Sequence, residues 1–534
     1  MKKFIRLGII VVVILAIVAG IVVTVVLNNR KTVRREEVIT DETVSGDLSI
    51  RLWEGGYGDQ WLVNVKNGFI AKYPNVNIDI KSSTERMVVF GEIVSGTNTQ
   101  YDLYFTDSVL YDYLDYLEPL NDVFTSTWSG ETASVESKIE DVYLDAYKTG
   151  DNYFFIPAYT GIYGFVYNTN YISEDAVPVT TDKLTELCAE LKLSGIKAIG
   201  YSGEAGVNYW NYAYSTWFAQ YEGLNAYQQM QIGRTINSAG EAVIDPASAY
   251  MTGGLEAMQV CEDLLWYENG YSDPQGTGKQ FITAQREFLQ GDFAMMYNGS
   301  WMMNEMRRHI GEGMEHDFKM MRVPVISSIV DKCPSIDGAT PEAKDDELAA
   351  LIHAIDAGVT DLDGEGYSVT QADYDRVKEA RQLVYGAGEM SSAVITKTAQ
   401  NKNLAKLFLR YMYSDEGIRL HASAMQGCTL PIKDTSIFQG EENIDYEMEF
   451  YETAYDIMFS SNRFFNNNRD AAVEVYCTAT NAADSIEKQF GSQSAADRTR
   501  ASVSFQAKKD LWTANDNDKY WQEMIAQGYV TEKP

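Results

Sequence analysis

Aromatic rings stand close to acidic side chains at several points of the sequence. The chain contains 35 Tyr and 9 Trp but only 4 His. Trp53 is followed directly by Glu54, and Tyr57 comes just beyond them. A flat ring stacks on the apolar face of a small molecule, and a carboxylate accepts hydrogen bonds from its polar groups. These residue types are therefore suited to the non-covalent binding of a small solute.

Sequence motifs of the common catalytic chemistries are missing. There is no GxSxG nucleophile turn, no HExxH zinc motif and no phosphate-binding P-loop. The 76 Asp and Glu residues supply many carboxylate pairs by chance, so such pairs are no evidence for glycoside hydrolysis. The segment that begins at Asp361 starts like a calcium loop, but Ala372 occupies its twelfth position, where a bidentate Glu is needed. We expect no catalytic residues, no bound metal and no cofactor.

The charge balance is strongly acidic. The formal net charge is −32, with 44 Lys and Arg against 76 Asp and Glu. Residues 1–35 hold seven of the basic residues and no acidic one, which leaves a formal charge of −39 for residues 36–534. Phosphate backbones demand a basic surface, so we exclude nucleic acid as a partner. The five cysteines are scattered without CxxC spacing, and we interpret them as small buried apolar residues.

The first 45 residues differ in composition from the rest of the chain. Leu7–Leu27 is a continuous apolar run, interrupted only by Gly and Thr. At 1.5 Å per residue it is about 30 Å long, the thickness of a bilayer core. A cleavable signal has a shorter apolar stretch and a small-residue cleavage site, and no convincing site is present. We expect an uncleaved transmembrane helix, followed by a flexible stalk over residues 28–45. Basic residues flank both ends of the run, so charge does not decide its orientation.

The remainder of the chain alternates short strand-like runs with amphipathic stretches, which is the pattern of an α/β fold. Strands are predicted over Leu48–Trp53, Val76–Ile80 and Tyr101–Thr106, with a helix over Trp61–Tyr73. In a doubly wound sheet, ligands bind beyond the carboxyl ends of such strands. The other predicted elements are a strand over Phe293–Tyr297 and helices over Asp182–Leu193, Ala257–Tyr267, Phe281–Gln290, Asp345–Ala357, Gln371–Tyr385 and Asn401–Tyr413.

Three segments, taken in order, carry a family resemblance. They are FIPAYTGIYGFVYN from Phe155 to Asn168, FLQGDFAMMYNGSW from Phe288 to Trp301, and AVIT at Ala393 followed by NKNLAKLFLRYMYSDEG from Asn401 to Gly417. Together they resemble family 1 extracellular solute-binding proteins, the group that includes the maltose-binding protein. The resemblance extends from about residue 46 to about residue 435. Residues 328–384 exceed the family pattern, and the part beyond residue 435 carries little that matches it.

The resemblance implies a two-lobed, type II periplasmic-binding-protein-like fold that closes on a solute between its lobes. By position, the chain would leave the first lobe near Ile156–Pro157, return near Val323–Pro324 and cross again near Leu430–Pro431. Residues 46–157 and 325–429 would then form the N-terminal lobe, which would carry a helical insertion at 328–384. Residues 158–324 and 430–534 would form the C-terminal lobe.

Candidate ligand contacts follow from the resemblance and from predicted strand ends. Trp301 stands where the family places an aromatic residue after a glycine-containing turn, and a core position is the competing interpretation. The other candidates are Trp53, Glu54 and Tyr57 after the first strand, Asp107 after the third strand, Tyr159 at the first crossing, and Tyr209 with Trp210 in an aromatic helix. A helical core stripe explains most of that aromatic stretch. Glu85 and Arg86 could reach the rim, although a surface ion pair is the simpler interpretation.

The resemblance predicts the solute-capturing subunit of a bacterial ABC importer. The expected solute is a carbohydrate, which aromatic rings and hydrogen-bonding side chains would contact. The expected protein partners are permease subunits. We expect a monomer whose large acidic portion is extracellular and whose Leu7–Leu27 helix lies in the cell membrane. Two alternatives stay open. One is a membrane-anchored sensor or adhesin ectodomain of the same fold, and the other is a binding protein for a non-sugar solute such as a peptide.

Overall fold

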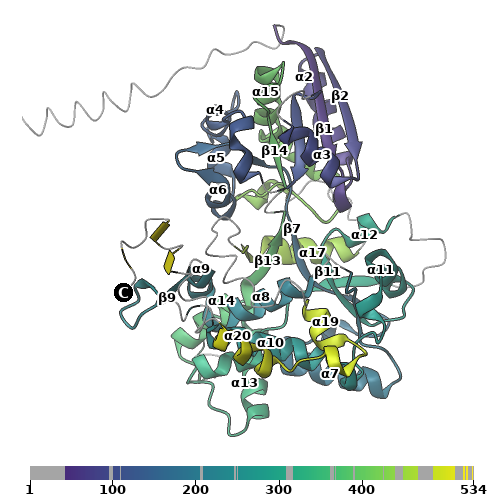
Figure 1. Cartoon of the computed structure of the whole chain (residues 1–534), viewed down its shortest axis with the longest axis vertical. Coiled ribbons are helices and arrows are strands. Elements are labelled where there is room, and N and C mark those ends of the chain that lie inside the picture. The colour runs from purple at the N-terminus through teal and green to yellow at the C-terminus, as the bar shows by residue number, and fades with distance from the viewer. Residues whose placement is uncertain are drawn as a thin grey trace, which may run out of the picture.

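Two lobes, stacked along the long axis, make up the computed structural model (Figure 1). The structure describes residues 43–95, 100–108, 110–204, 209–231, 233–245, 248, 250–307, 317–360, 362, 366, 368–388, 391–424, 426–438, 449–466, 485–511, 521–522, 525–526 and 532. The predicted membrane helix over Leu7–Leu27 lies outside these residues, as do residues 361, 363–365 and 367 of the calcium-like loop that begins at Asp361. None of the described helices is both long and apolar enough to cross a bilayer.

The first lobe is built on a five-stranded sheet in the order β2-β1-β3-β14-β6. Its strands are β1 (Ser45–Trp53), β2 (Asn75–Ser83), β3 (Leu103–Asp107), β14 (Ser391–Val394) and β6 (Ile156–Pro157). The helices of this lobe include α2 (Gln60–Lys72), α3 (Arg86–Val94), α6 (Asp141–Tyr147), α15 (Lys402–Met412) and α16 (Asp415–Ala422). β1 pairs in parallel with β2 and β3, so the ends of β1 and β3 meet at one edge, as predicted.

Helix α2 shows why the sequence folds this way. Its buried residues Trp61, Leu62, Val65 and Phe69 recur at helical spacing and form one apolar face. That face packs into the core of the first lobe, where Trp61 contacts Phe105 of β3 at a ring-centroid distance of 5.2 Å. The predicted helix over Trp61–Tyr73 and the three predicted strands of this lobe are therefore confirmed to within a few residues.

The second lobe is built on a six-stranded sheet in the order β15-β13-β7-β11-β8, with β12 also paired to β7. Its central strand β7 (Gly161–Asn168) is buried over its whole length. The other strands are β8 (Ile199–Gly200), β11 (Met295–Gly299), β12 (Phe318–Met321), β13 (Leu383–Ala387) and β15 (Asn462–Phe464). Its main helices are α7 (Thr181–Leu193), α8 (Tyr209–Glu222), α10 (Thr252–Leu265), α11 (Phe281–Leu289), α13 (Pro341–Asp356), α14 (Gln371–Gln382), α17 (Glu449–Phe459), α19 (Ile486–Gly491) and α20 (Ala501–Leu511).

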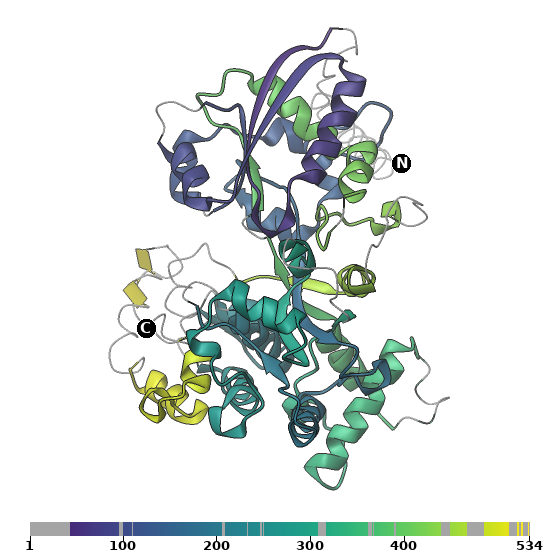
Figure 2. The same ribbon diagram turned by 90° about the vertical axis from the view of Figure 1, so that its right-hand side faces the viewer.

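The insertion at residues 328–384 lies on the second lobe, whereas the sequence placed it on the first. Helix α14 contacts α8, and α13 contacts the short helix Ser327–Lys332, which itself contacts α8. Helix α13 lies at the base of the second lobe (Figure 1 and Figure 2), and α14 lies above it beside α8. The predicted helix over Gln371–Tyr385 also ends early, because Leu383–Ala387 is strand β13. Leu, Val and Tyr at its start favour a strand once β7 and β15 are there to pair with it.

The chain crosses between the lobes at three places. The first crossing, from β6 into β7, is where the sequence predicted it. The second runs from β13 into β14, so the predicted return near Val323–Pro324 is wrong. These two crossings run antiparallel, with Pro157 opposite Ser392 and Gly161 opposite Ala387. The third passes through Thr429, which bridges to Thr160, close to the predicted Leu430–Pro431.

Tyrosine hydroxyl groups hold the three crossings together. Tyr143 donates a hydrogen bond to the carbonyl of Ala387 at 3.2 Å, and Tyr413 donates one to the carbonyl of Pro157 at 2.9 Å. Tyr455 of α17 accepts from the Gly427 amide at 2.7 Å and donates to the Cys428 carbonyl at 3.1 Å. Each of these hydroxyls is buried, where a satisfied hydrogen bond is worth most. The crossings therefore form a defined hinge and not a loose linker.

The cysteines behave as the sequence predicted where they are described. Cys188, Cys261, Cys333 and Cys428 are buried free thiols. Burial raises the pKa of Cys188 and Cys428 to about 12, so these thiols stay protonated and unreactive. Cys477 lies outside the described residues.

Candidate functional site

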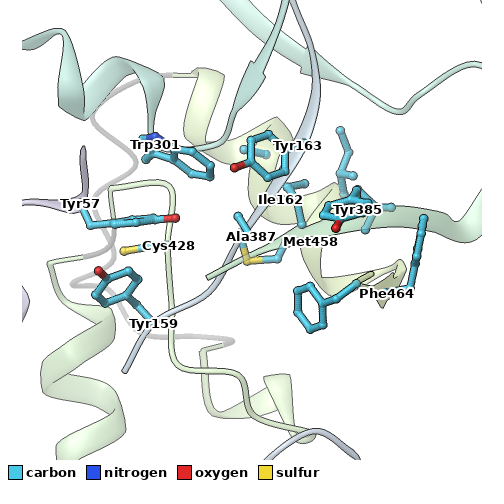
Figure 3. Close-up of a cluster of buried hydrophobic side chains, with 14 of the residues drawn as sticks. Tyr57, Tyr159, Ile162, Tyr163, Trp301, Tyr385, Ala387, Cys428, Met458 and Phe464 are labelled. Carbon is cyan, nitrogen blue, oxygen red and sulfur yellow. The ribbon is translucent and has the colours of Figure 1, made fainter. Parts of the chain in front are cut away.

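Seven aromatic residues from both lobes meet beside the hinge, and we call them the interlobe ring cluster. They are Tyr57, Tyr159, Tyr163, Tyr209, Tyr212, Trp301 and Tyr385. Figure 3 shows Tyr57 and Tyr159 on one side of the crossing strands and Trp301 above them, with Tyr163 and Tyr385 farther along. The chain segments that supply them lie far apart in sequence, so only the two-lobed fold brings them together.

Trp301 lies at the centre of the contacts between the lobes. Its ring centroid is 5.0 Å from that of Tyr57 and 5.1 Å from that of Tyr163. Trp301 comes two residues after the end of β11. Between them, the Ser300 amide donates to the carbonyl of Ile162 in β7 at 2.9 Å. A Cβ added at Gly56 would lie 2.5 Å from Trp301 Cδ1, so the backbone of the first lobe touches the indole directly. The sequence prediction placed Trp301 between the lobes, and the structure does so too.

Tyr57 and Tyr159 form the part of the cluster nearest the first lobe. Their ring centroids are 4.2 Å apart, and only 1% of Tyr159 is exposed. Burial raises the pKa of both hydroxyls, and the nearby carboxylate of Asp107 raises it further. Asp107 ends β3 and accepts a hydrogen bond from the Ser391 hydroxyl at 3.1 Å. The predicted residues Tyr57, Asp107 and Tyr159 thus share one electrostatic environment.

Tyr209 enters the cluster from the second lobe. It lies on the first turn of α8, and its ring is 5.3 Å from Tyr163. Burial raises the pKa of its hydroxyl most. The carboxylate of Glu305 raises this pKa further, and that of Asp107 does so more weakly. Glu305 ends the short helix α12 (Met302–Glu305) and accepts a hydrogen bond from Gln285 Nε2 at 2.9 Å. Two carboxylates from different lobes therefore act on the same tyrosine.

Trp210 does not join the cluster, although it is next to Tyr209 in the sequence. Its ring packs in the second-lobe core against Phe165, Trp217 and Tyr297, at centroid distances of 6.0, 6.3 and 6.2 Å. A helix turns by about 100° per residue, so adjacent side chains face different directions. The core-stripe interpretation therefore describes Trp210.

Trp53 and Glu54 lie at the edge of the site, where β1 ends. Both are half-buried, and the indole nitrogen of Trp53 donates to the Thr84 carbonyl at 3.2 Å. Glu85 and Arg86 are exposed at the start of α3. Arg86 is near enough to lower the pKa of Asp107, although burial has the larger effect and raises it overall. These residues flank the ring cluster without packing into it.

Tyr163, Tyr212, Tyr385 and Glu305 were not predicted. Tyr163 was visible in the segment FIPAYTGIYGFVYN, four residues after Tyr159, and Tyr212 follows Tyr209 at helical spacing. Tyr163 and Tyr212 stack at a centroid distance of 4.2 Å. Nothing in the local sequence distinguishes Tyr385 or Glu305, because their positions depend on long-range strand pairing and on the turn after β11.

The two lobes touch on both sides of the crossing strands. Beside the ring cluster, Asn304 Nδ2 donates to the Gly56 carbonyl at 2.6 Å. Arg463 of β15 forms an ion pair with Glu140 of the first lobe, and both side chains are largely buried. The structure is therefore an arrangement in which the lobes are closed on each other.

Metal-ligating side chains do not gather in the described part of the chain. No group of three or more His, Cys, Asp or Glu residues is placed there so that it could hold a metal ion. The site offers aromatic faces, carboxylates and hydroxyl groups, which are suited to non-covalent contacts with a small molecule.

Residues 91–437 of the chain match the family model described as "Bacterial extracellular solute-binding protein". Comparison of the chain with curated proteins finds no match.

Solved structures share the fold at low sequence identity. A chitin oligosaccharide binding protein is 16% identical with a TM-score of 0.55, and the alignment covers 88% of this chain and 100% of that one. A cyclic alpha-maltosyl-1,6-maltose binding protein from Arthrobacter globiformis is 16% identical with a TM-score of 0.53, covering 88% and 99%. A solute-binding protein in complex with raffinose is 14% identical with a TM-score of 0.52, covering 88% and 100%.

Proposed function

The chain belongs to the bacterial extracellular solute-binding protein family, and we propose that it captures a carbohydrate between its lobes and delivers it to an ABC permease. The observation that carries the sugar assignment is the interlobe ring cluster, in which Trp301, Tyr57 and Tyr159 meet carboxylates from both lobes. Sugar rings present apolar C–H faces to aromatic side chains and hydroxyl groups to carboxylates. The similar solved structures include binding proteins for chitin oligosaccharide and cyclic alpha-maltosyl-1,6-maltose and one in complex with raffinose, which supports the same solute class.

Binding requires the lobes to move apart first. The Tyr57 and Trp301 centroids are 5.0 Å apart. A sugar ring stacked between them needs about 3.5–4.0 Å on each side, roughly 7–8 Å in total. We infer that the lobes open about the three crossings, that the solute enters, and that closure on the solute shifts the population toward the form the permease recognises.

We also propose that the apolar run Leu7–Leu27 anchors the protein in the cell membrane with the lobes outside. The length of the run and the lack of a convincing cleavage site support this proposal. Cell fractionation with a protease-accessibility assay tests it. Protein that is released by high salt, or that is protected in intact cells, would contradict the anchored extracellular arrangement.

Isothermal titration calorimetry of the full-length protein in detergent against a glycan panel tests the solute class. We expect micromolar or tighter binding of at least one neutral or charged oligosaccharide and no turnover of it. Binding of a peptide with no binding of any glycan would contradict the carbohydrate assignment. Stimulation of a permease ATPase by the loaded protein distinguishes transport from a sensor or adhesin role of the same fold.

Replacement of Trp301 by alanine is expected to weaken solute binding by about 1–3 kcal/mol, because the stacked ring contributes its apolar contact area. The measurement is the calorimetric dissociation constant. Trp128→Ala is the matched control, since Trp128 is half-buried against Tyr411 in the first lobe, outside the ring cluster. Equal affinities of the Trp301 variant and the unchanged protein would remove the indole from the site.

A further inference from the structure

Asp107 and Glu305 face the interlobe ring cluster from opposite lobes. Asp107 ends β3 of the first lobe, and Glu305 ends α12 of the second. Both carboxylates raise the pKa of the Tyr209 hydroxyl, Glu305 more strongly than Asp107. Glu305 also reaches the backbone of the first lobe, since a Cβ added at Gly56 would lie 3.3 Å from its Oε1.

Within the described part of the chain, neither carboxylate forms an ion pair. Asp107 accepts a hydrogen bond from the neutral side chain of Ser391, and Glu305 accepts one from the neutral side chain of Gln285. Both are half-buried, and burial raises the pKa of each. Arg86 is the nearest cation to act on Asp107, but it is exposed at the start of α3. Partly buried carboxylates without a counter-charge are costly to keep.

Within the described part of the chain, two buried polar atoms at the same place make no hydrogen bond of normal geometry. They are the hydroxyl of Tyr159, where the nearby Ser391 side chain opposes the rise in pKa, and Oε1 of Gln285. Tyr159 is 1% exposed, Gln285 is fully buried, and Figure 3 shows the Tyr159 hydroxyl pointing toward Tyr57 within the cluster. Buried donors and acceptors are normally satisfied, so unpaired ones beside unpaired carboxylates indicate groups that a ligand completes.

We propose that the solute carries a protonated amino group, and that the site takes an amino-sugar unit held between Asp107, Glu305 and the rings. This inference rests on the proposed carbohydrate function and names the chemical class within it. An ammonium group donates three hydrogen bonds, which suits two carboxylates and a tyrosine hydroxyl.

The aromatic rings also favour a positively charged solute. Aromatic faces attract cations through their negative quadrupole, and Tyr57, Tyr159 and Trp301 together form a partly enclosed set of such faces. The formal charge of −39 on residues 36–534 would also draw a cationic solute toward the protein. A neutral sugar could donate hydroxyl hydrogen bonds to the carboxylates, but it would leave their charge uncompensated.

Three β-1,4-linked trisaccharides that differ only at C2 test the proposal on the unaltered full-length protein in detergent. They are the glucosamine trimer, which bears amines, the N-acetylglucosamine trimer and cellotriose. By calorimetry at neutral pH we expect the amine form to bind at least about 10-fold more tightly than either neutral form, the size of effect expected for a charge-assisted pair. The preference should narrow as salt is raised, because ions screen the attraction.

Asp107→Asn and Glu305→Gln assign the effect to residues. Each variant should lose most of the preference, so that the amine trimer and the two neutral trisaccharides bind it with similar affinities. Asp79→Asn, an exposed carboxylate on β2, makes the same charge change outside the site and should preserve the preference. Neutral forms that bind as tightly as the amine form would overturn this inference and leave the carbohydrate function standing. A lack of binding by all glycans, with binding of a peptide, would instead refute the carbohydrate function and the inference with it.

Discussion

Replacement of Gly427 by alanine is expected to lower the free energy of unfolding by about 3 kcal/mol or more. Gly427 lies in the third crossing with φ at +87°, in the left-handed region that favours glycine. An added Cβ would lie 1.8 Å from the carbonyl oxygen of Ser300 and 2.8 Å from Cα of Trp301. Both of those atoms belong to backbone, so a side-chain rotation cannot relieve the overlap.

The same change should also disturb the site. The Ser300 hydroxyl donates to the Gly427 carbonyl at 2.5 Å, which ties the turn that carries Trp301 to the hinge. Moving the two backbones apart displaces the indole that packs on Tyr57. We therefore expect Gly427→Ala to weaken solute binding in the fraction of protein that still folds.

Gly130→Ala is the matched control for that variant. Gly130 has φ at +89°, and an added Cβ there would meet nothing within 4 Å. It carries the same backbone penalty of roughly 1–2 kcal/mol without the overlap. Chemical denaturation followed by circular dichroism measures both. Equal losses in the two variants would show that the close approach of Gly427 to Ser300 adds nothing.

Much of the fold could be predicted because its elements are locally encoded. The apolar face of α2 and the alternation in β1 and β2 are readable in short windows of sequence. The second crossing could not be predicted in this way. Leu383–Tyr385 continues a helical pattern in sequence, and only pairing with β7 and β15 makes it a strand. Because of that long-range pairing, the insertion at residues 328–384 belongs to the second lobe and not to the first lobe, where we expected it.

Strand ends and a crossing predicted part of the group of residues that meets between the lobes. Tyr57, Asp107, Tyr159 and Trp301 all follow strands or lie at a crossing, and the structure brings them together. Helix orientation was the weak point, since the choice between Tyr209 and Trp210 depends on which face of α8 meets the sheet. Glu305 carries no sequence signal, because its place beside the interlobe ring cluster depends on the turn after β11 and on α12.

The C-terminal part of the chain lies beyond the family match, which ends at residue 437, and it contacts the segments next to the interlobe ring cluster. Tyr455 of α17 holds the Gly427 and Cys428 backbone. Glu487 of α19 accepts a hydrogen bond from the Trp210 amide at 3.2 Å, at the first turn of α8. Because Tyr209 occupies that same turn, α19 helps to fix a member of the interlobe ring cluster.

Glu487→Gln is expected to make the protein more stable above pH 7, relative to the unchanged protein. Glu487 is 1% exposed, and burial raises its pKa from 4.5 to about 7, with the amides of Glu487 and Trp210 opposing the shift. The folded state therefore binds this proton more tightly than the unfolded state. Stability from this group is complete below pH 4.5 and is lost as pH rises to about 7. The total loss is about 3 kcal/mol by linkage.

The glutamine variant retains an acceptor for the Trp210 amide and has no proton to lose. Chemical denaturation from pH 4.5 to pH 8 gives the difference in unfolding free energy between variant and unchanged protein. We expect this difference to grow in favour of the variant by about 3 kcal/mol across that range, while other titrating groups cancel. Asp497→Asn, at an exposed acid in the same C-terminal part, is the control for replacing an acid by its amide. A flat profile for Glu487→Gln would mean that water or another group solvates the carboxylate, and that α19 does not hold α8 through a buried acid.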